Sequence, residues 1–100
     1  MVQEATLEAY KAELIRIIEQ YLPNCHIYLF GSRATGTNRE GADIDVAIEC
    51  DSQIARRIIT QIIGDVEDAN IPVLVDIVDL NSVSTEMRTQ ILKEKVTWKN

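Results

Sequence analysis

Two aspartates occupy alternate positions in the sequence Asp43-Ile44-Asp45. Residues 43–49 alternate between polar and apolar side chains, which predicts a β-strand with both carboxylates on one face and a core on the other. Two carboxylates aimed at one point repel each other unless a cation lies between them. The pair therefore indicates a divalent metal site, with a solvated strand face as the other interpretation.

A third carboxylate, Asp76, lies within the most apolar segment, residues 72–80. The β-branched residues of this segment predict a strand buried on both faces, where a carboxylate is costly unless it is hydrogen-bonded or bound to a cation. Asp76 is thus predicted to be a third metal ligand or a structural carboxylate. Asp79 lies on the opposite face at the strand end, which favours a solvated or capping role. Oxygen ligands alone suit Mg²⁺ or Mn²⁺ and reactions of phosphates.

Gly31 and Ser32 directly follow a predicted strand at residues 27–30 and begin a loop that has room for one helical turn. Backbone N–H groups and a hydroxyl at such a turn can receive a phosphate. Residues 31–41 contain neither a Walker motif nor a dinucleotide-binding glycine pattern. Arg33 and Arg39 of the same loop could contact a triphosphate or could simply be solvated.

The remaining segments predict the scaffold of this site. Apolar residues at three- and four-residue steps predict amphipathic helices at residues 5–22 and 54–66, the second capped by Asp51 or Ser52. A last helix follows residues 82–85, and residues 96–98 are interpreted as a tail. The order α-β-loop-β-α-β-α predicts an α+β fold with a small mixed sheet, helices packed on one face, and one domain over residues 1–100.

Composition narrows the function classes. Ten Lys and Arg against 16 Asp and Glu give the 100-residue chain a formal charge of −6, which argues against direct nucleic-acid binding. No apolar run is long enough to cross a membrane and the first residues do not form a secretion signal, so a cytoplasmic protein is expected. Cys25 and Cys50 form no Cys-x-x-Cys pair and are expected to be reduced. With His26 as the single histidine, any chemistry depends on carboxylates.

Residues 31–48, GSRATGTNREGADIDVAI, resemble the signature of the DNA polymerase β-like nucleotidyltransferase superfamily, in which Gly-Ser and a loop precede Asp-x-Asp on the next strand. The whole chain is similar to the minimal nucleotidyltransferase (MNT) domain, with Asp76 of the sequence VDIVDL as the third carboxylate. Ala42 stands where family members often have serine.

The resemblance implies a Mg²⁺-dependent nucleotidyltransferase that uses ATP. The implied catalytic and metal-binding residues are Asp43, Asp45 and Asp76, for two Mg²⁺ ions that Mn²⁺ can replace. The implied nucleotide-binding residues are Gly31, Ser32 and Arg33.

The resemblance also implies a partner. MNT proteins commonly accompany a helical HEPN-domain toxin, so the chain is expected to act as an antitoxin that transfers AMP to a hydroxyl of that toxin, in a hetero-oligomer or as a homodimer. A catalytically silent MNT-fold module that neutralises its partner by contact is the alternative. A transferase for a small molecule such as an aminoglycoside is a weaker rival, because it would need an added acceptor domain.

Overall fold

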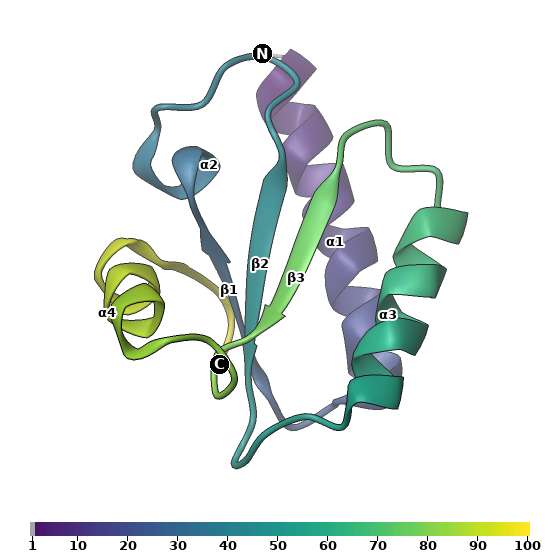
Figure 1. Ribbon diagram of the computed structural model, residues 1–100. Coiled ribbons are helices and arrows are strands. Elements are labelled where there is room, and N and C mark those ends of the chain that lie inside the picture. Colours follow the sequence, from purple (N-terminus) through teal and green to yellow (C-terminus); the bar gives the residue numbers. More distant parts are fainter. Residues whose placement is uncertain (1) are drawn as a thin grey trace.

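The computed structural model describes residues 2–100, with side chains from Leu7 onward (Figure 1). The elements in chain order are α1 (Val2–Tyr21), β1 (His26–Phe30), α2 (Ser32–Thr35), β2 (Ile44–Glu49), α3 (Arg56–Asp68), β3 (Val75–Asp79), α4 (Thr85–Glu94) and β4 (Val96–Lys99). The three helices and three strands predicted from the sequence are present, and α2 is the single turn for which the loop had room.

The strands form one sheet in the order β3-β2-β1-β4. β1 is antiparallel to both β2 and β4, whereas β2 is parallel to β3, so the sheet is mixed and the predicted α+β fold is confirmed. β4 was not predicted as a strand. This short segment becomes a strand because it pairs with β1, for example Val96 opposite Leu29. The local sequence of the segment does not show that pairing.

The larger core lies between the sheet and the helices α1 and α3, which cover the same face (Figure 1). Helical spacing places Leu14, Ile17 and Ile18 of α1 on one side, and strand alternation does the same for Ile44, Val46 and Ile48 of β2. The side chains of Asp43 and Asp45 therefore point to the other face of the sheet.

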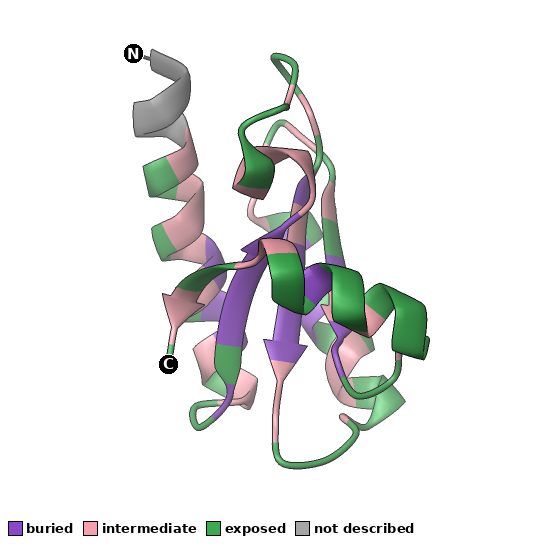
Figure 2. Ribbon diagram, turned by 90° about the vertical axis from the view of Figure 1, so that its left-hand side faces the viewer, coloured by how far each residue is buried: buried purple, intermediate pink, exposed green. Residues whose placement is uncertain are grey.

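That other face is partly covered by α4. Ile91 of α4 packs there with Tyr28, Phe30, Ala47 and Leu80 in a smaller core. In Figure 2 most of α4 is exposed, and Ile91 is its one buried residue. The helices therefore do not all share one face, because apolar residues of β1 and β2 on the second face also need cover. The uncovered part of this face lies toward Asp43 and Asp76, which are both exposed.

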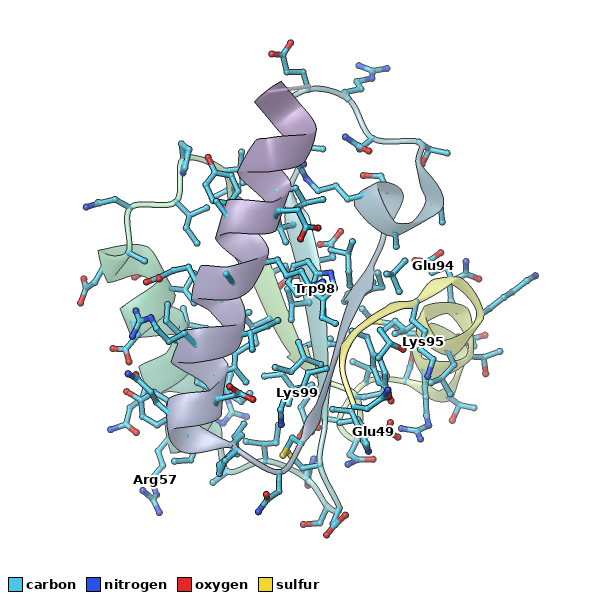
Figure 3. The ribbon with its side chains drawn as sticks, turned by 180° about the vertical axis from the view of Figure 1, so that it is seen from behind. Glu49, Arg57, Glu94, Lys95, Trp98 and Lys99 are labelled. Atoms are coloured by element: carbon cyan, nitrogen blue, oxygen red, sulfur yellow. A yellow bond between two sulfur atoms is a disulfide. The ribbon has the colours of Figure 1, made fainter. Side chains whose placement is uncertain are left out.

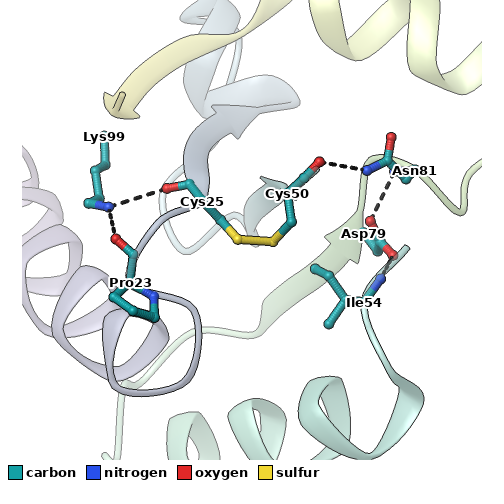
Figure 4. The surroundings of a disulfide bond; sticks show 7 residues. All are labelled: Pro23, Cys25, Cys50, Ile54, Asp79, Asn81 and Lys99. Atoms are coloured by element: carbon teal, nitrogen blue, oxygen red, sulfur yellow. Dashed lines mark hydrogen bonds between the residues drawn. A yellow bond between two sulfur atoms is a disulfide. The ribbon is translucent and has the colours of Figure 1, made fainter. Parts of the chain in front are cut away.

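Cys25 and Cys50 form a disulfide that joins the start of β1 to the end of β2 (Figure 4). The expectation that both are reduced is thus wrong for this structure. Cys25 precedes His26 and Cys50 follows Glu49, the end pair of the β1–β2 ladder, and the two Cα atoms are 4.6 Å apart. This pairing depends on the strand register, and no Cys-x-x-Cys spacing in the sequence indicates it.

Replacing both cysteines with serine should lower the free energy of unfolding by about 3 kcal/mol, because the bond restricts the conformational freedom of the unfolded chain across a 25-residue separation. Urea unfolding of the oxidised protein, of the same protein in dithiothreitol and of the double variant measures this. Reductant should destabilise the first protein and leave the variant unchanged. Equal stability of all three would show that the bond does not form in solution.

Candidate active site

Asp45 is the central residue of the candidate site. On one side its register partner is Asp76 of β3, and on the other it is Phe30 of β1, the residue before Gly31. Asp43 lies two residues earlier, just before β2, on the same face as Asp45. The fold thus brings the three predicted carboxylates to one end of the sheet.

The charge of Asp45 is poorly compensated. Burial and the nearby carboxylates of Asp76, Asp43 and Glu94 all raise the pKa of Asp45 above its usual value. Within the described part of the chain, no three carboxylate, imidazole or thiolate groups already converge into a metal-binding cluster. The carboxylates are therefore neighbours that a cation could draw together, and they offer oxygen donors only.

The exposure of Asp76 corrects the sequence interpretation. The segment was expected to be buried on both faces, yet Asp76 is exposed and Leu74 beside it is 74% exposed. β3 is an edge strand, and α4 does not reach this end of its second face. Asp76 is thus open to solvent at the site.

The buried carboxylate of β3 is Asp79, which is 7% exposed. Its Oδ2 accepts hydrogen bonds from Ile54 N at 2.7 Å and Ser82 Oγ at 2.9 Å, and its Oδ1 accepts one from Asn81 N at 2.9 Å. The capping role considered for Asp79 is confirmed. The predicted cap by Asp51 or Ser52 is wrong, because α3 begins after Ala55 and has no side-chain cap.

Asp79→Asn should lower the free energy of unfolding by roughly 2 to 4 kcal/mol, because an amide NH₂ would face donors that now share a charged carboxylate. Asp76→Asn is the matched control on the same strand and should change stability by less than about 0.5 kcal/mol, since Asp76 is exposed. Urea unfolding measures both. Equal effects of the two substitutions would contradict the assignment of Asp79 as the structural carboxylate.

Gly31 lies directly against Asp45. A Cβ built on Gly31 would be 3.0 Å from Asp45 Cγ and closer still to Oδ2. Gly31 also has φ 78° and ψ −159°, a conformation that is essentially restricted to glycine. Only glycine therefore allows the turn that begins α2 to approach the carboxylates this closely.

Arg33 holds the loop between the turn and the strand. Its Nε and Nη2 donate to Ala42 O at 3.0 and 2.7 Å, which ties α2 to the residue before Asp43. The predicted contact of Arg33 with a nucleotide stays a prediction beside this positioning role. Ser32 opens α2 and is partly exposed, whereas Arg39 is exposed.

Glu94 is the residue of the site that sequence reasoning missed. Gly31 N donates to Glu94 Oε1 at 2.8 Å, across a separation of 63 residues. Figure 3 labels Glu94 at the end of α4 that lies toward α2. No local pattern distinguishes Glu94 from the other glutamates of the chain, because its position depends on how α4 crosses the sheet.

None of the helices described here is both long and apolar enough to span a membrane.

Comparisons with known proteins bear on this arrangement. Residues 12–99 match the family described as Polymerase beta, Nucleotidyltransferase. A curated relative, "Protein adenylyltransferase MntA" of Shewanella oneidensis, is 33% identical over an alignment of 91 residues that covers 86% of this chain and 63% of the relative. The chain thus spans less than two thirds of that relative.

Solved structures share the fold. A chain from a crystal structure of a toxin–antitoxin with AMP-PNP is 27% identical, with a TM-score of 0.75, over 88% of this chain and 71% of its own length. A chain from a complex of tri-AMPylated Shewanella oneidensis HEPN toxin with MNT antitoxin is 24% identical, with a TM-score of 0.71, over 91% and 70%. This second likeness supports the fold alone.

Proposed function

The chain belongs to the polymerase β nucleotidyltransferase family, and we propose that it transfers AMP from ATP to a hydroxyl of a HEPN-type toxin and so acts as its antitoxin. One observation carries the proposal: Asp45 stands in register with Asp76 and lies directly against Gly31. A phosphate-binding turn and metal-binding carboxylates are thereby adjacent, as nucleotidyl transfer requires. The transfer of AMP to a protein is carried from the relative named a protein adenylyltransferase, and the toxin–antitoxin role is carried from the similar structure with AMP-PNP.

The side chains fit Mg²⁺. Asp43, Asp45 and Asp76 supply carboxylate oxygens only, and the raised pKa of Asp45, caused by burial and then by its acidic neighbours, is what a bound cation would relieve. We assign these three residues as ligands of two Mg²⁺ ions, with Mn²⁺ as a substitute. When bound, such ions neutralise charge on the triphosphate and on the attacking and leaving oxygens.

The other residues position the reactants. The N–H of Gly31 and the hydroxyl of Ser32 donate to phosphate oxygens, while Arg33 fixes the loop through Ala42 O. The acceptor oxygen bonds to the α-phosphorus as the bond from that phosphorus to the bridging oxygen breaks. Pyrophosphate leaves with the electron pair, and the hydroxyl proton passes to Asp76, whose exposure keeps it accessible to an arriving acceptor.

The test is incubation of the purified chain with ATP, Mg²⁺ and a HEPN-domain toxin, followed by intact mass spectrometry of both proteins. The expected result is the addition of one or more AMP units to the partner. Omission of Mg²⁺ should prevent the addition. A stable complex without any AMP transfer would contradict the enzymatic proposal.

The alternative function is inhibition of the toxin by contact, with the chemistry lost. It is favoured by the hydrogen bond from the Gly31 N–H to Glu94, which occupies a donor that a phosphate would need. In that case toxin inhibition would survive replacement of Asp43 and Asp45. A growth assay with toxin and either antitoxin variant separates the two functions.

Use of ATP would place the reaction in the cytoplasm, where thiols are kept reduced. The transfer assay should therefore be run with and without reductant. Cys25 and Cys50 lie at the end of β1 and β2 away from Phe30 and Asp45, so transfer should proceed in both conditions.

A further inference from the structure

The backbone N–H of Gly31 already has an anionic partner. Glu94 Oε1 accepts its hydrogen at 2.8 Å, and the other oxygen, Oε2, accepts from Gln90 Nε2 at 2.9 Å. The N–H of Gly31 is the donor that the proposed function assigns to a phosphate. One N–H cannot donate a full hydrogen bond to a carboxylate and to a phosphate at the same time, so a nucleotide must displace Glu94.

The position of Glu94 is fixed by the docking of α4. Arg88 Nη2 pairs with Glu49 Oε2 at 3.1 Å, and Lys95 Nζ lies 4.0 Å from the centre of the Tyr28 ring. Burial and a 2.9 Å hydrogen bond to Glu49 raise the pKa of Tyr28 to about 12, so its hydroxyl remains a donor. These contacts hold α4 against the sheet and thereby keep Glu94 beside Gly31.

The helix itself does not favour this placement. Glu94 is the last residue of α4, where the helix dipole is negative and a carboxylate is disfavoured. Glu94 also lies close enough to Asp45 to raise its pKa, after the larger effects of burial, Asp76 and Asp43. A triphosphate without a metal would therefore meet Glu94 and the aspartates as like charges, whereas a metal-bound triphosphate carries compensating positive charge.

We propose that Glu94 is a specificity-determining residue of the nucleotide site: it occupies the Gly31 N–H and rejects metal-free nucleotides, and a metal-bound triphosphate displaces it. This inference rests on the proposed function, because it concerns the same nucleotide. It makes Glu94 a competitor of the phosphate and assigns it no part in the transfer step.

The first test needs no nucleotide. In ¹H–¹⁵N spectra of the free protein, Glu94→Ala should shift the Gly31 amide upfield and speed its hydrogen exchange, because the hydrogen bond is lost. Glu86→Ala is the matched control, since it removes the same charge from the exposed first turn of α4. An unchanged Gly31 amide in Glu94→Ala would overturn the proposal.

The second test measures AMP-PNP binding by calorimetry, once with Mg²⁺ and once with EDTA. Glu94→Ala should bind metal-free AMP-PNP about tenfold more tightly than the unmodified protein does, a change of about 1.4 kcal/mol. Its gain in affinity for the Mg²⁺ complex of AMP-PNP should be smaller. Glu94→Gln keeps the shape and removes the charge, so it should show a similar loss of metal preference. Glu86→Ala should change neither affinity.

The outcomes separate the two proposals. Equal metal-dependent binding by the unmodified protein and both Glu94 variants would overturn the role of Glu94 and leave the nucleotide site standing. No binding by any of these proteins would overturn the nucleotide site, and the role of Glu94 with it.

Discussion

Asp45→Asn is expected to reduce Mg²⁺-dependent AMP transfer by at least about 1,000-fold, because it removes a carboxylate that faces Asp76 across the strands. Metal ions at such sites contribute several kcal/mol to the transition state, and every 1.4 kcal/mol is a factor of ten. The same substitution should raise the free energy of unfolding at neutral pH, because it removes the cost of partly burying a charge and then relieves repulsion from Asp76, Asp43 and Glu94. Activity and stability are thus expected to change in opposite directions.

The stability gain has a defined pH dependence. Burial and the acidic neighbours raise the pKa of Asp45 in the folded protein above 3.8, so the folded protein binds more protons than the unfolded chain between 3.8 and the raised value. Stability therefore falls as the pH rises through this window. Asp45→Asn lacks this loss, so its advantage should grow across the window and then stay constant toward neutral pH.

The measurements are the AMP-transfer rate and urea unfolding at acidic and neutral pH. Asp51→Asn is the control, because it removes an aspartate from the exposed turn after β2 and should leave both quantities nearly unchanged. Transfer by Asp45→Asn at the rate of the unmodified protein would exclude Asp45 as a metal ligand. A stability gain that is the same at all pH values would exclude the charge of Asp45 as its cause.

The features that local patterns could predict are those with a single dominant periodicity. Residues 43–49 alternate between polar and apolar side chains except at Ala47, so the strand and the shared face of Asp43 and Asp45 follow from the sequence. Helical spacing in α1 likewise identified the side that packs on the sheet. The Gly31-Ser32 turn could be recognised because it stands between a strand and the Asp-x-Asp strand.

The features that could not be predicted depend on partners far away in the chain. A continuous apolar run such as residues 72–80 does not say which face is covered, so Asp76 was expected to be buried although the edge strand leaves it exposed. β4 exists only through its ladder with β1. The contact of Glu94 with Gly31 requires α4 to cross the second face of the sheet, which no periodicity encodes.

Gly31→Ala should lower the free energy of unfolding by roughly 3 kcal/mol and abolish AMP-PNP binding. The φ and ψ angles of Gly31 cost a non-glycine residue about 1 to 3 kcal/mol, and the added methyl would meet the Asp45 carboxylate. Gly36→Ala is the control for backbone strain alone, because Gly36 has φ 78° with no atoms within 4 Å of a built Cβ. It should cost about 1 kcal/mol and leave binding unchanged.

The double variant Gly31→Ala with Asp45→Ala isolates the steric part. Asp45→Ala removes the carboxylate that the methyl at Gly31 would meet, so the double variant should be more stable than the sum of the single effects predicts, by about 1 to 3 kcal/mol. Nucleotide binding should not return, because the carboxylate is gone. Additive effects on unfolding would mean that Asp45 does not lie against Gly31 in solution. The phosphate-binding turn and the carboxylates would then not form one site.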